Sequence, residues 1–435
     1  MKGRKLVIAV VTAAFCGVQL FAAEQKPNIL LIMADDLGYE TIGCYGAKDY
    51  KTPHIDALAS KGVRFNHCYS QPLCTPSRVK MMTGRYNSRN YEGFGYLNPK
   101  EITFGNILKK AGYRTCIAGK WQLSGDATTV KAFGFDEHCL WNMHVYKKSA
   151  PNAKEPKGTR WLKRYDSPAL YKNGQWTTHP KGVYGPQLCA DFICSFIEQN
   201  KDQPFFVYYP MILPHSPFVR TPNSDRTGKG NNKKNFVDMV EYMDFLVGQI
   251  VEQLERQGVL DNTLILFTGD NGTHSSIMSE TTSRRVKGGK SSMTDAGTRV
   301  PLVASWPGKS PTGKILNDLV DFSDFLPTLC EAAGAPIPSD RIIDGRTFLP
   351  QIQGKEGEPR EWVYCYYWGS KDMEKKGVRR EFVRDQRWKL YNNGQMYDIE
   401  NDVLEQSPLK EDEPELIVVR KRLKAALEAA REGNN

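Results

Sequence analysis

Short, unbroken apolar runs are spaced along the chain between segments with a helical pattern. The runs at residues 29–33, 204–210 and 264–268 contain no charged side chain, which is typical of strands buried on both faces of a parallel sheet. Residues 104–111 and 236–257 instead repeat apolar positions at helical spacing, which indicates amphipathic helices. This alternation favours an α/β fold in which a doubly wound, mostly parallel sheet is flanked by helices.

Further elements follow from the same pattern and from the residues that end it. Pro53 suits the first turn of a helix, and Gly62 and Gly334 suit positions just beyond a helix end. Additional strands are predicted at residues 63–69, 113–118 and 300–306, and additional helices at residues 53–61, 187–199 and 321–333. Residues 147–185 are rich in Lys, Pro, Gly and Trp with weak periodicity, and we expect an insertion at the rim of a binding site there.

The pattern changes from about residue 359 onward. Short segments at residues 363–368, 381–385 and 388–391 predict antiparallel strands, joined by turns such as Asn393-Gly394. A charged helix is expected at residues 414–431. We therefore predict a catalytic domain at residues 24–355 and a smaller α+β subdomain, with a short antiparallel sheet, at residues 356–435.

The first residues have the pattern of a secretory signal peptide. Three basic residues precede an apolar run at residues 6–21, and the small residues 22–23 offer a cleavage site. The run is short for a membrane span, and a lipoprotein signal at Cys16 is disfavoured by the bulky Phe15. We expect a signal peptide at residues 1–23 and an exported protein, periplasmic or secreted, with no stable membrane insertion after the leader is removed.

Charge and cysteine content narrow the classes of function. The chain has 59 basic and 49 acidic residues, a net charge of +10, but no long basic run of the kind that tracks nucleic acid. A mild basic excess is compatible with an anionic substrate. Ten cysteines include one in the predicted leader, so an odd number remains, and the absence of CxxC pairs argues against a zinc site. Disulfide pairing stays open.

Carboxylate and amide side chains follow two of the predicted central strands. Asp35 and Asp36 come directly after the run at residues 29–33, and Asp270 and Asn271 come just after the run at residues 264–268. In open α/β sheets, ligands bind at the carboxyl ends of the strands. Hard oxygen ligands of this kind suit Ca²⁺ or Mg²⁺. The alternative for Asp35 and Asp36 alone is an acidic turn or a helix cap.

A cysteine opens a predicted helix at the same edge of the sheet, in the run Cys74-Thr75-Pro76-Ser77-Arg78. Unpaired backbone N–H groups at a helix N-terminus favour negative charge, and Arg78 lies about one turn further on. The cysteine is either a nucleophile or a structural residue in a tight turn. Three more groups follow strand ends or a glycine loop: Lys120, His215 and Lys290. A metal-type ligand set, a nucleophile and several cations would suit hydrolysis of an oxyanion ester.

Five ordered blocks together resemble the formylglycine-dependent sulfatases of the alkaline-phosphatase-like superfamily. The run from Cys74 to Arg78, with Thr83-Gly84, matches the signature C-x-P-S-R followed by T-G. The other four blocks are Asp35-Asp36, Gly119-Lys120-Trp121, Asp270-Asn271-Gly272, and Gly289-Lys290 through Arg299-Val300-Pro301. The resemblance runs from about residue 27 to the C-terminus.

The resemblance implies a sulfuric ester hydrolase whose nucleophile is made from Cys74. A separate enzyme, either formylglycine-generating or anaerobic sulfatase-maturing, would convert Cys74 to 3-oxoalanine (formylglycine), and its hydrate would attack sulfur. One Ca²⁺ per chain would be held by the residues Asp35, Asp36, Asp270, Asn271 and residue 74. Arg78 would stabilise the hydrate, Lys120 and Lys290 would hold sulfate oxygens, and His215 would help to protonate the leaving oxygen.

One position departs from many family members, which have a histidine two residues after the lysine. This chain has Gln122 there, and an amide can hydrogen-bond the hydrate or a sulfate oxygen but cannot shuttle a proton at neutral pH. His274 is a candidate local substitute or a substrate contact. Aromatic and basic residues in the variable middle are candidate sugar contacts, with core packing as the alternative for the tryptophans: Trp141, His144, Trp161, Arg164 and Trp176.

The sequence thus predicts removal of sulfate from a sulfated carbohydrate, such as a glycosaminoglycan, a mucin-type glycan or an algal glycan. A phosphodiesterase or phosphonate monoester hydrolase of the same superfamily is the alternative enzyme, and a non-catalytic glycan-binding protein is a third possibility. The single dense set of carboxylates and amides favours one metal ion and sulfate over a two-metal site. The sugar, the sulfated position and the oligomeric state are left open.

Overall fold

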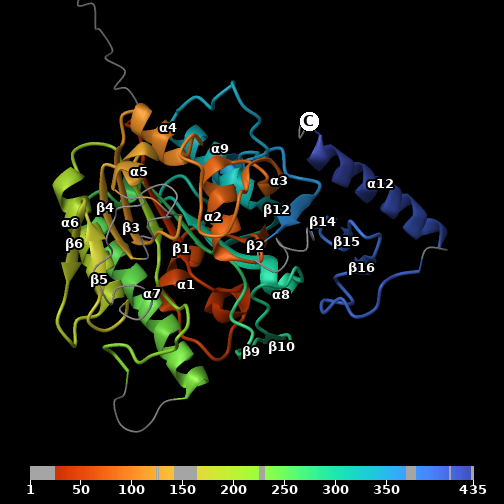
Figure 1. Cartoon of the computed structure of the whole chain (residues 1–435), viewed down its shortest axis with the longest axis horizontal. Helices are drawn as coiled ribbons and strands as arrows, with labels where there is room; N and C mark the ends of the chain where they lie inside the picture. Colours follow the sequence, from red (N-terminus) through yellow and green to blue (C-terminus); the bar gives the residue numbers. More distant parts are fainter. Residues whose placement is uncertain are drawn as a thin grey trace, which may run out of the picture.

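The computed structural model describes residues 25–123, 125, 127–141, 164–224, 231–368, 379–410 and 413–432. The leader predicted at residues 1–23 and two candidate sugar contacts, His144 and Trp161, lie outside this part of the chain. A ten-stranded sheet forms the centre, in the order β12-β2-β11-β8-β1-β7-β3-β4-β5-β6. Helices cover both of its faces (Figure 1).

The central strands are parallel and fully buried. Strand β1 (Asn28–Ala34) pairs in parallel with β7 (Phe205–Pro210) and with β8 (Thr263–Gly269). Every residue of these three strands is buried, because helices cover the side chains that alternate between the two faces. This arrangement confirms the predicted mostly parallel, helix-flanked sheet.

The remaining strands extend the sheet on both sides of this centre. They are β2 (Val63–Tyr69), β3 (Arg114–Lys120), β4 (Glu137–Trp141), β5 (Ala169–Lys172), β6 (Gln175–Thr178), β11 (Arg299–Ser305) and β12 (Lys314–Asp321). Strand β11 runs antiparallel to both of its neighbours, β2 and β8. Its first residues therefore lie beside the carboxyl ends of parallel strands.

Two layers of helices enclose two hydrophobic cores. Helices α1 (Pro53–Ser60), α6 (Gly185–Asn200) and α7 (Asn232–Arg256) pack over the face that carries Leu30 and Ile32. Helices α2 (Cys74–Thr83), α4 (Phe104–Lys110) and α9 (Phe325–Ala332) cover the opposite face. The sheet is thus sealed on both sides, and polar groups gather at its strand ends.

Shorter elements connect these layers. They are η1 (Tyr39–Thr41), η2 (Gly43–Tyr45), α3 (Asn87–Asn90), α5 (Ala127–Ala132), η3 (Leu260–Asn262), α8 (Asp295–Thr298), η4 (Phe322–Asp324) and α10 (Leu349–Ile352). A small hairpin pairs β9 (Met278–Glu280) with β10 (Arg285–Lys287). Among the described residues, no helix is long and apolar enough to cross a membrane.

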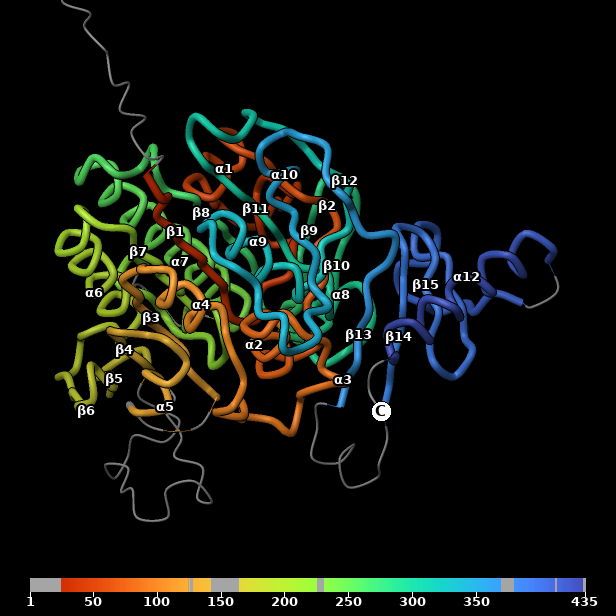
Figure 2. The backbone as a smooth tube through the Cα atoms, turned by 90° about the horizontal axis from the view of Figure 1, so that it is seen from above, coloured from red at the N-terminus to blue at the C-terminus, as the bar shows by residue number. Residues whose placement is uncertain are grey.

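A four-stranded antiparallel sheet and a final helix form a lobe beside the main sheet (Figure 2). Its strands are β13 (Val363–Tyr367), β14 (Arg380–Arg384), β15 (Trp388–Tyr391) and β16 (Met396–Asp398), and its helix is α12 (Pro414–Arg431). Leu423 and Leu427 of α12 share a core with Tyr364 and Leu390 of the sheet. The smaller α+β unit was predicted; the exact boundary at residues 355 and 356 stays a prediction.

Two segments differ from the sequence prediction. The helix predicted at residues 321–333 begins later, because residues 314–321 form β12, which pairs in parallel with β2. Asp321 ends that strand and caps η4, since its carboxylate accepts a hydrogen bond from Ser323 N at 2.9 Å. The segment predicted as a rim insertion contains β5 and β6, which extend the edge of the main sheet.

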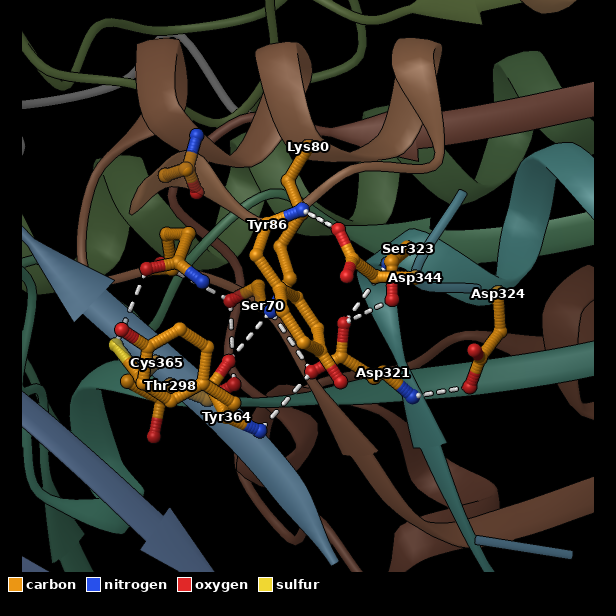
Figure 3. A network of polar contacts seen from close by, with 12 residues as sticks. Ser70, Lys80, Tyr86, Thr298, Asp321, Ser323, Asp324, Asp344, Tyr364 and Cys365 are labelled. Atoms are coloured by element: carbon orange, nitrogen blue, oxygen red, sulfur yellow. Dashed lines mark hydrogen bonds and ion pairs between the residues drawn. The ribbon is translucent and has the colours of Figure 1, made fainter. Parts of the chain in front are cut away.

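Helix α2 is fixed from behind by a network of buried charges (Figure 3). Lys80 Nζ donates to Asp321 Oδ2 at 2.7 Å and to the carbonyl of Tyr364 at 2.6 Å. Arg360 forms a buried ion pair with Asp324, with Nη2 2.5 Å from Oδ1. The network joins the first residues after β2 to the end of β12 and to β13, so that the two sheets together set the position of α2.

Candidate active site

Three strand ends and one helix start place the predicted polar residues together. Asp35 follows β1, Asp270 follows β8, Lys120 is the last residue of β3, and Cys74 is the first residue of α2. Backbone hydrogen bonds lock the strand ends to one another: Asp270 N donates to Ala34 O at 2.9 Å, and Asp35 N donates to Leu213 O at 2.9 Å. The site therefore forms where the parallel strands end, as expected for this type of sheet.

Carboxylates and the thiol lie close enough to share one cation. The ligand atoms of Asp35, Cys74 and Asp270 all lie within 4.8 Å of one another, and so do those of Asp35, Asp36 and His215. Asp36 N donates to Asp270 Oδ1 at 3.0 Å. Asp36 adopts a left-handed backbone with φ of 64°, which is uncommon for a residue other than glycine. This conformation allows the two adjacent carboxylates to enter the same site.

The donor set fits a hard divalent cation. Asn271 Nδ2 donates to Asp36 Oδ1 at 2.9 Å and to the carbonyl of Gly272 at 3.0 Å. Asn271 Oδ1 is buried and has no hydrogen-bond donor among the described residues. A buried acceptor without a donor costs free energy unless a ligand completes it. Three carboxylates and one free amide oxygen are ligands of the type that Ca²⁺ prefers.

Lysines neutralise two of the carboxylates. Lys120 Nζ lies 2.8 Å from Asp35, and Lys290 Nζ lies 2.5 Å from Asp36 Oδ2. Burial is the largest single effect and alone would raise the pKa of Asp35. Lys120 and the other surrounding cations together outweigh it, so the pKa lies well below its usual range. The pKa of Asp36 is lowered in the same way, because nearby cations overcome the effect of burial. Both carboxylates are therefore ionised at neutral pH.

Asp270 behaves differently from the other two carboxylates. Burial and the negative charge of Asp35 raise the pKa of Asp270 to about 7, although Arg78 opposes the shift. Arg78 Nη2 lies 3.1 Å from Asp270 Oδ2, and Nη1 donates to Lys120 O at 2.6 Å. A carboxylate that titrates near neutrality inside a cluster of charges is typical of a functional site.

With Asp270 ionised, the charges of the site balance before any ligand is added. Three carboxylates stand against three cations, which are Arg78, Lys120 and Lys290. A divalent cation would leave a net positive charge in a buried space, where charge interactions are strong. The arrangement therefore favours an anionic substrate.

Cys74 is buried at the start of α2 with 2% of its surface exposed. Burial raises the pKa of the Cys74 thiol above its usual value, although Lys120 acts in the opposite direction. The residue is a neutral thiol at pH 7, and thiolate chemistry is disfavoured. The unmodified thiol is therefore poorly suited to act as the nucleophile.

His215 lies on the open side of the cluster with 21% of its side chain exposed. Burial lowers the pKa of His215 to about 4, despite the nearby carboxylates, so the imidazole is neutral at pH 7. Nδ1 lies 2.6 Å from Ser216 O and Nε2 lies 3.2 Å from Lys290 Nζ. The shorter contact assigns the proton to Nδ1 and leaves Nε2 to accept from the lysine.

Arg164 and Gln122 border the same space. Arg164 Nη2 lies 3.1 Å from His215 Nδ1, and its guanidinium lies over the Trp141 ring at 4.6 Å. Gln122 has φ of 53°, and its Oε1 is buried without a hydrogen-bond donor among the described residues. Arg164, stacked on Trp141, therefore lies beside His215, the candidate catalytic histidine.

Two further predicted contacts lie elsewhere. Trp176 packs against Tyr171 at 5.3 Å on the edge strand β6, and core packing was the stated alternative for it. The His274 ring packs against Phe218 at 5.6 Å, and Nδ1 lies 2.9 Å from Ser276 Oγ. These contacts give neither residue a link to the carboxylate cluster.

Sequence reasoning missed one residue of the site, Tyr367 of β13. Burial raises the pKa of Tyr367 to about 12, and the thiol of Cys74 and the hydroxyl of Ser291 are among the groups that act on it. Tyr367 shares a small hydrophobic cluster with Leu73, the residue before Cys74, so the antiparallel sheet packs against the start of α2. Its alternating strand pattern gave no sign of this, because the contact depends on how the two sheets pack.

Comparisons with known proteins agree with this geometry. Residues 27–335 match the family described as Sulfatase, and residues 289–433 match the family described as N-sulphoglucosamine sulphohydrolase, C-terminal. The N-acetylgalactosamine-6-sulfatase of Homo sapiens is 33% identical over 372 residues, which covers 78% of this chain and 68% of the relative. The steryl-sulfatase of Homo sapiens is 30% identical over 431 residues, covering 79% of this chain and 73% of the relative.

A solved structure gives the same fold. It is described as Ps i-CgsB in complex with k-i-k-neocarrahexaose and superposes with a TM-score of 0.78 at 28% identity. The match covers 94% of this chain and 94% of that chain. The likeness thus extends over the main sheet and the smaller antiparallel sheet alike.

Proposed function

The chain belongs to the sulfatase family, and we propose that it removes sulfate from a sulfated carbohydrate through a nucleophile made from Cys74. The observation that carries the proposal is the position of Cys74. It opens α2 beside the carboxylates of Asp35 and Asp270, which lie within 4.8 Å of its sulfur. Lys120 and Lys290 supply positive charge to the same space.

The nucleophile in this proposal is the hydrated formylglycine that a maturing enzyme makes from Cys74. It supplies one hydroxyl to attack sulfur and a second hydroxyl to expel sulfate afterwards. Arg78 is fixed by Asp270 at 3.1 Å and by the carbonyl of Lys120 at 2.6 Å. A guanidinium held in this way can orient a hydroxyl at residue 74 without moving during the reaction.

One Ca²⁺ would be held by Asp35, Asp36, Asp270, Asn271 and residue 74. Bound there, it would supply positive charge toward the sulfate oxygens. The free Oδ1 of Asn271 and the raised pKa of Asp270 support this assignment. Lys120 and Lys290 would then hold sulfate oxygens by hydrogen bonds that strengthen as charge develops on the transferred group.

Proton transfer to the leaving oxygen would fall to His215. Its Nε2 lies 3.2 Å from Lys290 Nζ on the partly exposed side of the site. A proton taken up there from solvent would be donated to the leaving alkoxide. Arg164 Nη2 lies 3.1 Å from Nδ1, and its positive charge disfavours protonation of the ring until a negative charge develops on the leaving oxygen. Gln122 supplies a hydrogen-bonding amide and no proton.

A carbohydrate substrate is supported by the printed descriptions of two similar proteins. One acts on N-acetylgalactosamine 6-sulfate by its name, and the other was solved with neocarrahexaose. The predicted leader supports export to the periplasm or beyond, where sulfated glycans are met. The chain also requires a maturing enzyme as its partner during synthesis.

The test is a screen of defined sulfated saccharides with protein coexpressed with a maturing enzyme. Sulfate release should be detected, and mass spectrometry should find the aldehyde at residue 74. Cys74→Ala should abolish release, whereas the control Cys194→Ala, at a cysteine in α6, should retain it. Faster hydrolysis of a phosphodiester or a phosphonate monoester than of any sulfate ester would overturn the proposal.

A further inference from the structure

A second cavity of about 420 Å³ lies between the main sheet and the antiparallel sheet. Its walls come from the end of β2, the β9–β10 hairpin, α8 and the start of β11 on one side, and from the β14–β15 turn and the segment after β16 on the other. Its lining shares no residue with the catalytic cluster. The volume is within the range of small-molecule binding sites.

Arginine side chains dominate this cavity. Four of them line it: Arg284, Arg299, Arg384 and Arg387. Only two carboxylates, Asp295 and Glu400, line it with them. The lining therefore has an excess of positive charge, which favours an anion.

Two of the arginines are already paired with carboxylates. Arg384 Nη1 bonds Asp295 Oδ1, and Arg387 Nη2 lies 2.7 Å from Asp398 Oδ2. Arg284 and Arg299 have no carboxylate within 4 Å among the described residues. The charge excess is thus located on these two side chains.

Arg284 and Arg299 are held in place by the same tyrosine. Arg284 Nη2 donates to Tyr39 Oη at 2.6 Å, and the guanidinium of Arg299 lies over the Tyr39 ring at 4.4 Å. Arg299 Nε donates to Asn66 O at 2.9 Å. Within the described part of the chain, these bonds use one N–H of each guanidinium. The other N–H groups remain for a ligand, and the side chains are already ordered to receive it.

We propose that this cavity is a second anion-binding site, separate from the catalytic cluster, in which Arg284 and Arg299 bind a sulfate or carboxylate group. A guanidinium recognises such groups through two parallel N–H···O bonds. His67 in the same wall adds a neutral ring, which can donate to or accept from the ligand. The site is adjacent to the catalytic one, because α8 contacts both: Gly289 N donates to Ala296 O at 3.2 Å, and Asp295 lines the cavity.

The ligand has two sources under the proposed function, on which this step rests. It is either an acidic group on a distant unit of the saccharide or the released sulfate ion. In both cases the chemistry that recognises it is the same. A saccharide long enough to reach both sites would be bound at two points, and its affinity would exceed that of a monosaccharide.

The test compares Arg284→Met with Arg285→Met. Arg285 is the adjacent residue of β10, its side chain is 70% exposed, and it pairs with Glu280 at 3.6 Å outside the cavity. In the first arm, inorganic sulfate is titrated by calorimetry into each full-length protein. In the second arm, KM is measured for a sulfated oligosaccharide and for the corresponding sulfated monosaccharide.

Loss of charge-assisted bonds should weaken binding about tenfold or more in at least one arm. If the Arg284→Met protein binds one sulfate ion fewer than wild type, the ligand is the free ion. If only its KM for the oligosaccharide rises, the ligand is an acidic group of the saccharide. Arg285→Met should match wild type throughout, and Arg284→Lys should fall between. Thermal unfolding of each variant establishes that it is folded.

The inference is overturned if Arg284→Met equals Arg285→Met in both arms. Failure of the proposed function is distinct, because wild type would then release no sulfate from any saccharide. The sulfate titration decides the inference in that case, since it requires no turnover.

Discussion

Two groups of buried charges lie on opposite sides of α2, and they differ in how completely their polar atoms are paired. Arg78 extends toward Asp270 and Lys120, whereas Lys80 extends toward Asp321 and Tyr364. Positions two residues apart on a helix point in nearly opposite directions. The first group is the catalytic cluster, and the second is the network of Figure 3.

In the network behind α2, the charged groups have a full set of hydrogen-bond partners. Asp321 accepts from Lys80 at 2.7 Å and from Ser323 N and Oγ at 2.9 and 2.7 Å. Arg360 bonds Asp324, the Tyr86 hydroxyl at 3.1 Å and the carbonyl of Asp344 at 2.6 Å. Buried charges that are fully paired keep a structure in place and have no capacity left for a ligand.

In the catalytic cluster, by contrast, several buried polar atoms lack a hydrogen-bond partner. Among the described residues, Arg78 Nε, Gln122 Oε1 and Asn271 Oδ1 are buried without hydrogen-bond partners. Asp270 titrates near neutral pH, since burial and Asp35 oppose its charge. Buried charge alone therefore does not mark a functional site. Buried polar atoms that lack a hydrogen-bond partner do. Variants on the two sides of α2 should therefore fail in different ways.

The largest effect is expected from Asp270→Asn. This change removes a metal ligand and the partner of Arg78, and activity should fall about 1,000-fold or more, which corresponds to roughly 4 kcal/mol. The free energy of unfolding without metal should not fall, because the ionised carboxylate is already disfavoured there. Sulfate release and urea unfolding in the presence of a chelator measure the two effects. The control is Asp261→Asn at an exposed position.

If the metal-free Asp270→Asn protein instead loses more than about 2 kcal/mol of stability, the cluster is as structural as the network, and the comparison fails.

Lys80→Met should give the opposite outcome. It leaves Asp321 buried without its cation, which costs about 3–5 kcal/mol in the free energy of unfolding. The kcat of the folded fraction should stay within a few-fold of wild type, because Lys80 contacts no catalytic group. Urea unfolding measures the loss of stability, and active-site titration allows kcat to be calculated for the folded fraction alone. The control is Lys110→Met at an exposed position. A loss of kcat with unchanged stability would contradict the assignment.

Calcium binding should release a proton in a pH-dependent way. The pKa of Asp270 is raised to about 7 by burial and by Asp35, and a metal ion requires the ionised form. The proton therefore competes with the metal below about pH 8. The affinity should rise about fivefold from pH 6 to pH 7, about twofold more to pH 8, and then level off. Calorimetry in buffers of different protonation enthalpy should detect nearly one proton at pH 6 and almost none at pH 8.5. Equal release at both values would show that Asp270 does not couple to the metal.

The smallest effect is expected from Gln122→His. The new imidazole replaces an amide whose Oε1 lacks a donor, and it introduces a group that titrates near neutral pH. We expect kcat to change by less than about tenfold, roughly 1.4 kcal/mol, and a new inflection in the pH profile of kcat. Gln122→Ala should lower kcat without that inflection. An unchanged pH profile in Gln122→His would place residue 122 outside the proton path.

Much of the fold follows from local pattern. The three central strands are continuous apolar runs, and a buried parallel sheet needs that composition. The predicted start of the helix at residue 321 was wrong, because Asp321 is the last residue of β12, a strand that pairs with the distant β2. Pairing between distant segments leaves no periodic signal in the chain.

The site was predictable where chemistry is local in sequence. Asp35 and Asp36 follow a strand directly, and the run from Cys74 to Arg78 has both its charge and its helix start in five residues. Tyr367 and the pairing of Arg164 with His215 were not predictable, since they depend on contacts between elements far apart in the chain. The composition of residues 147–185 could not show that Arg164 lies at the site whereas Trp176 packs on the edge strand.

The burial of Cys74 has a consequence for the order of events during synthesis. Its cover includes the last strands of the chain: Gln71, just before it, contacts Cys365 across 294 positions at 3.1 Å. At about 5–20 residues per second, translation of that interval takes roughly 15 to 60 s. During that time the segment around Cys74 has emerged but cannot yet be enclosed. A maturing enzyme therefore has a window set by the ribosome, and slower translation of the middle of the chain should increase the fraction of molecules that are modified.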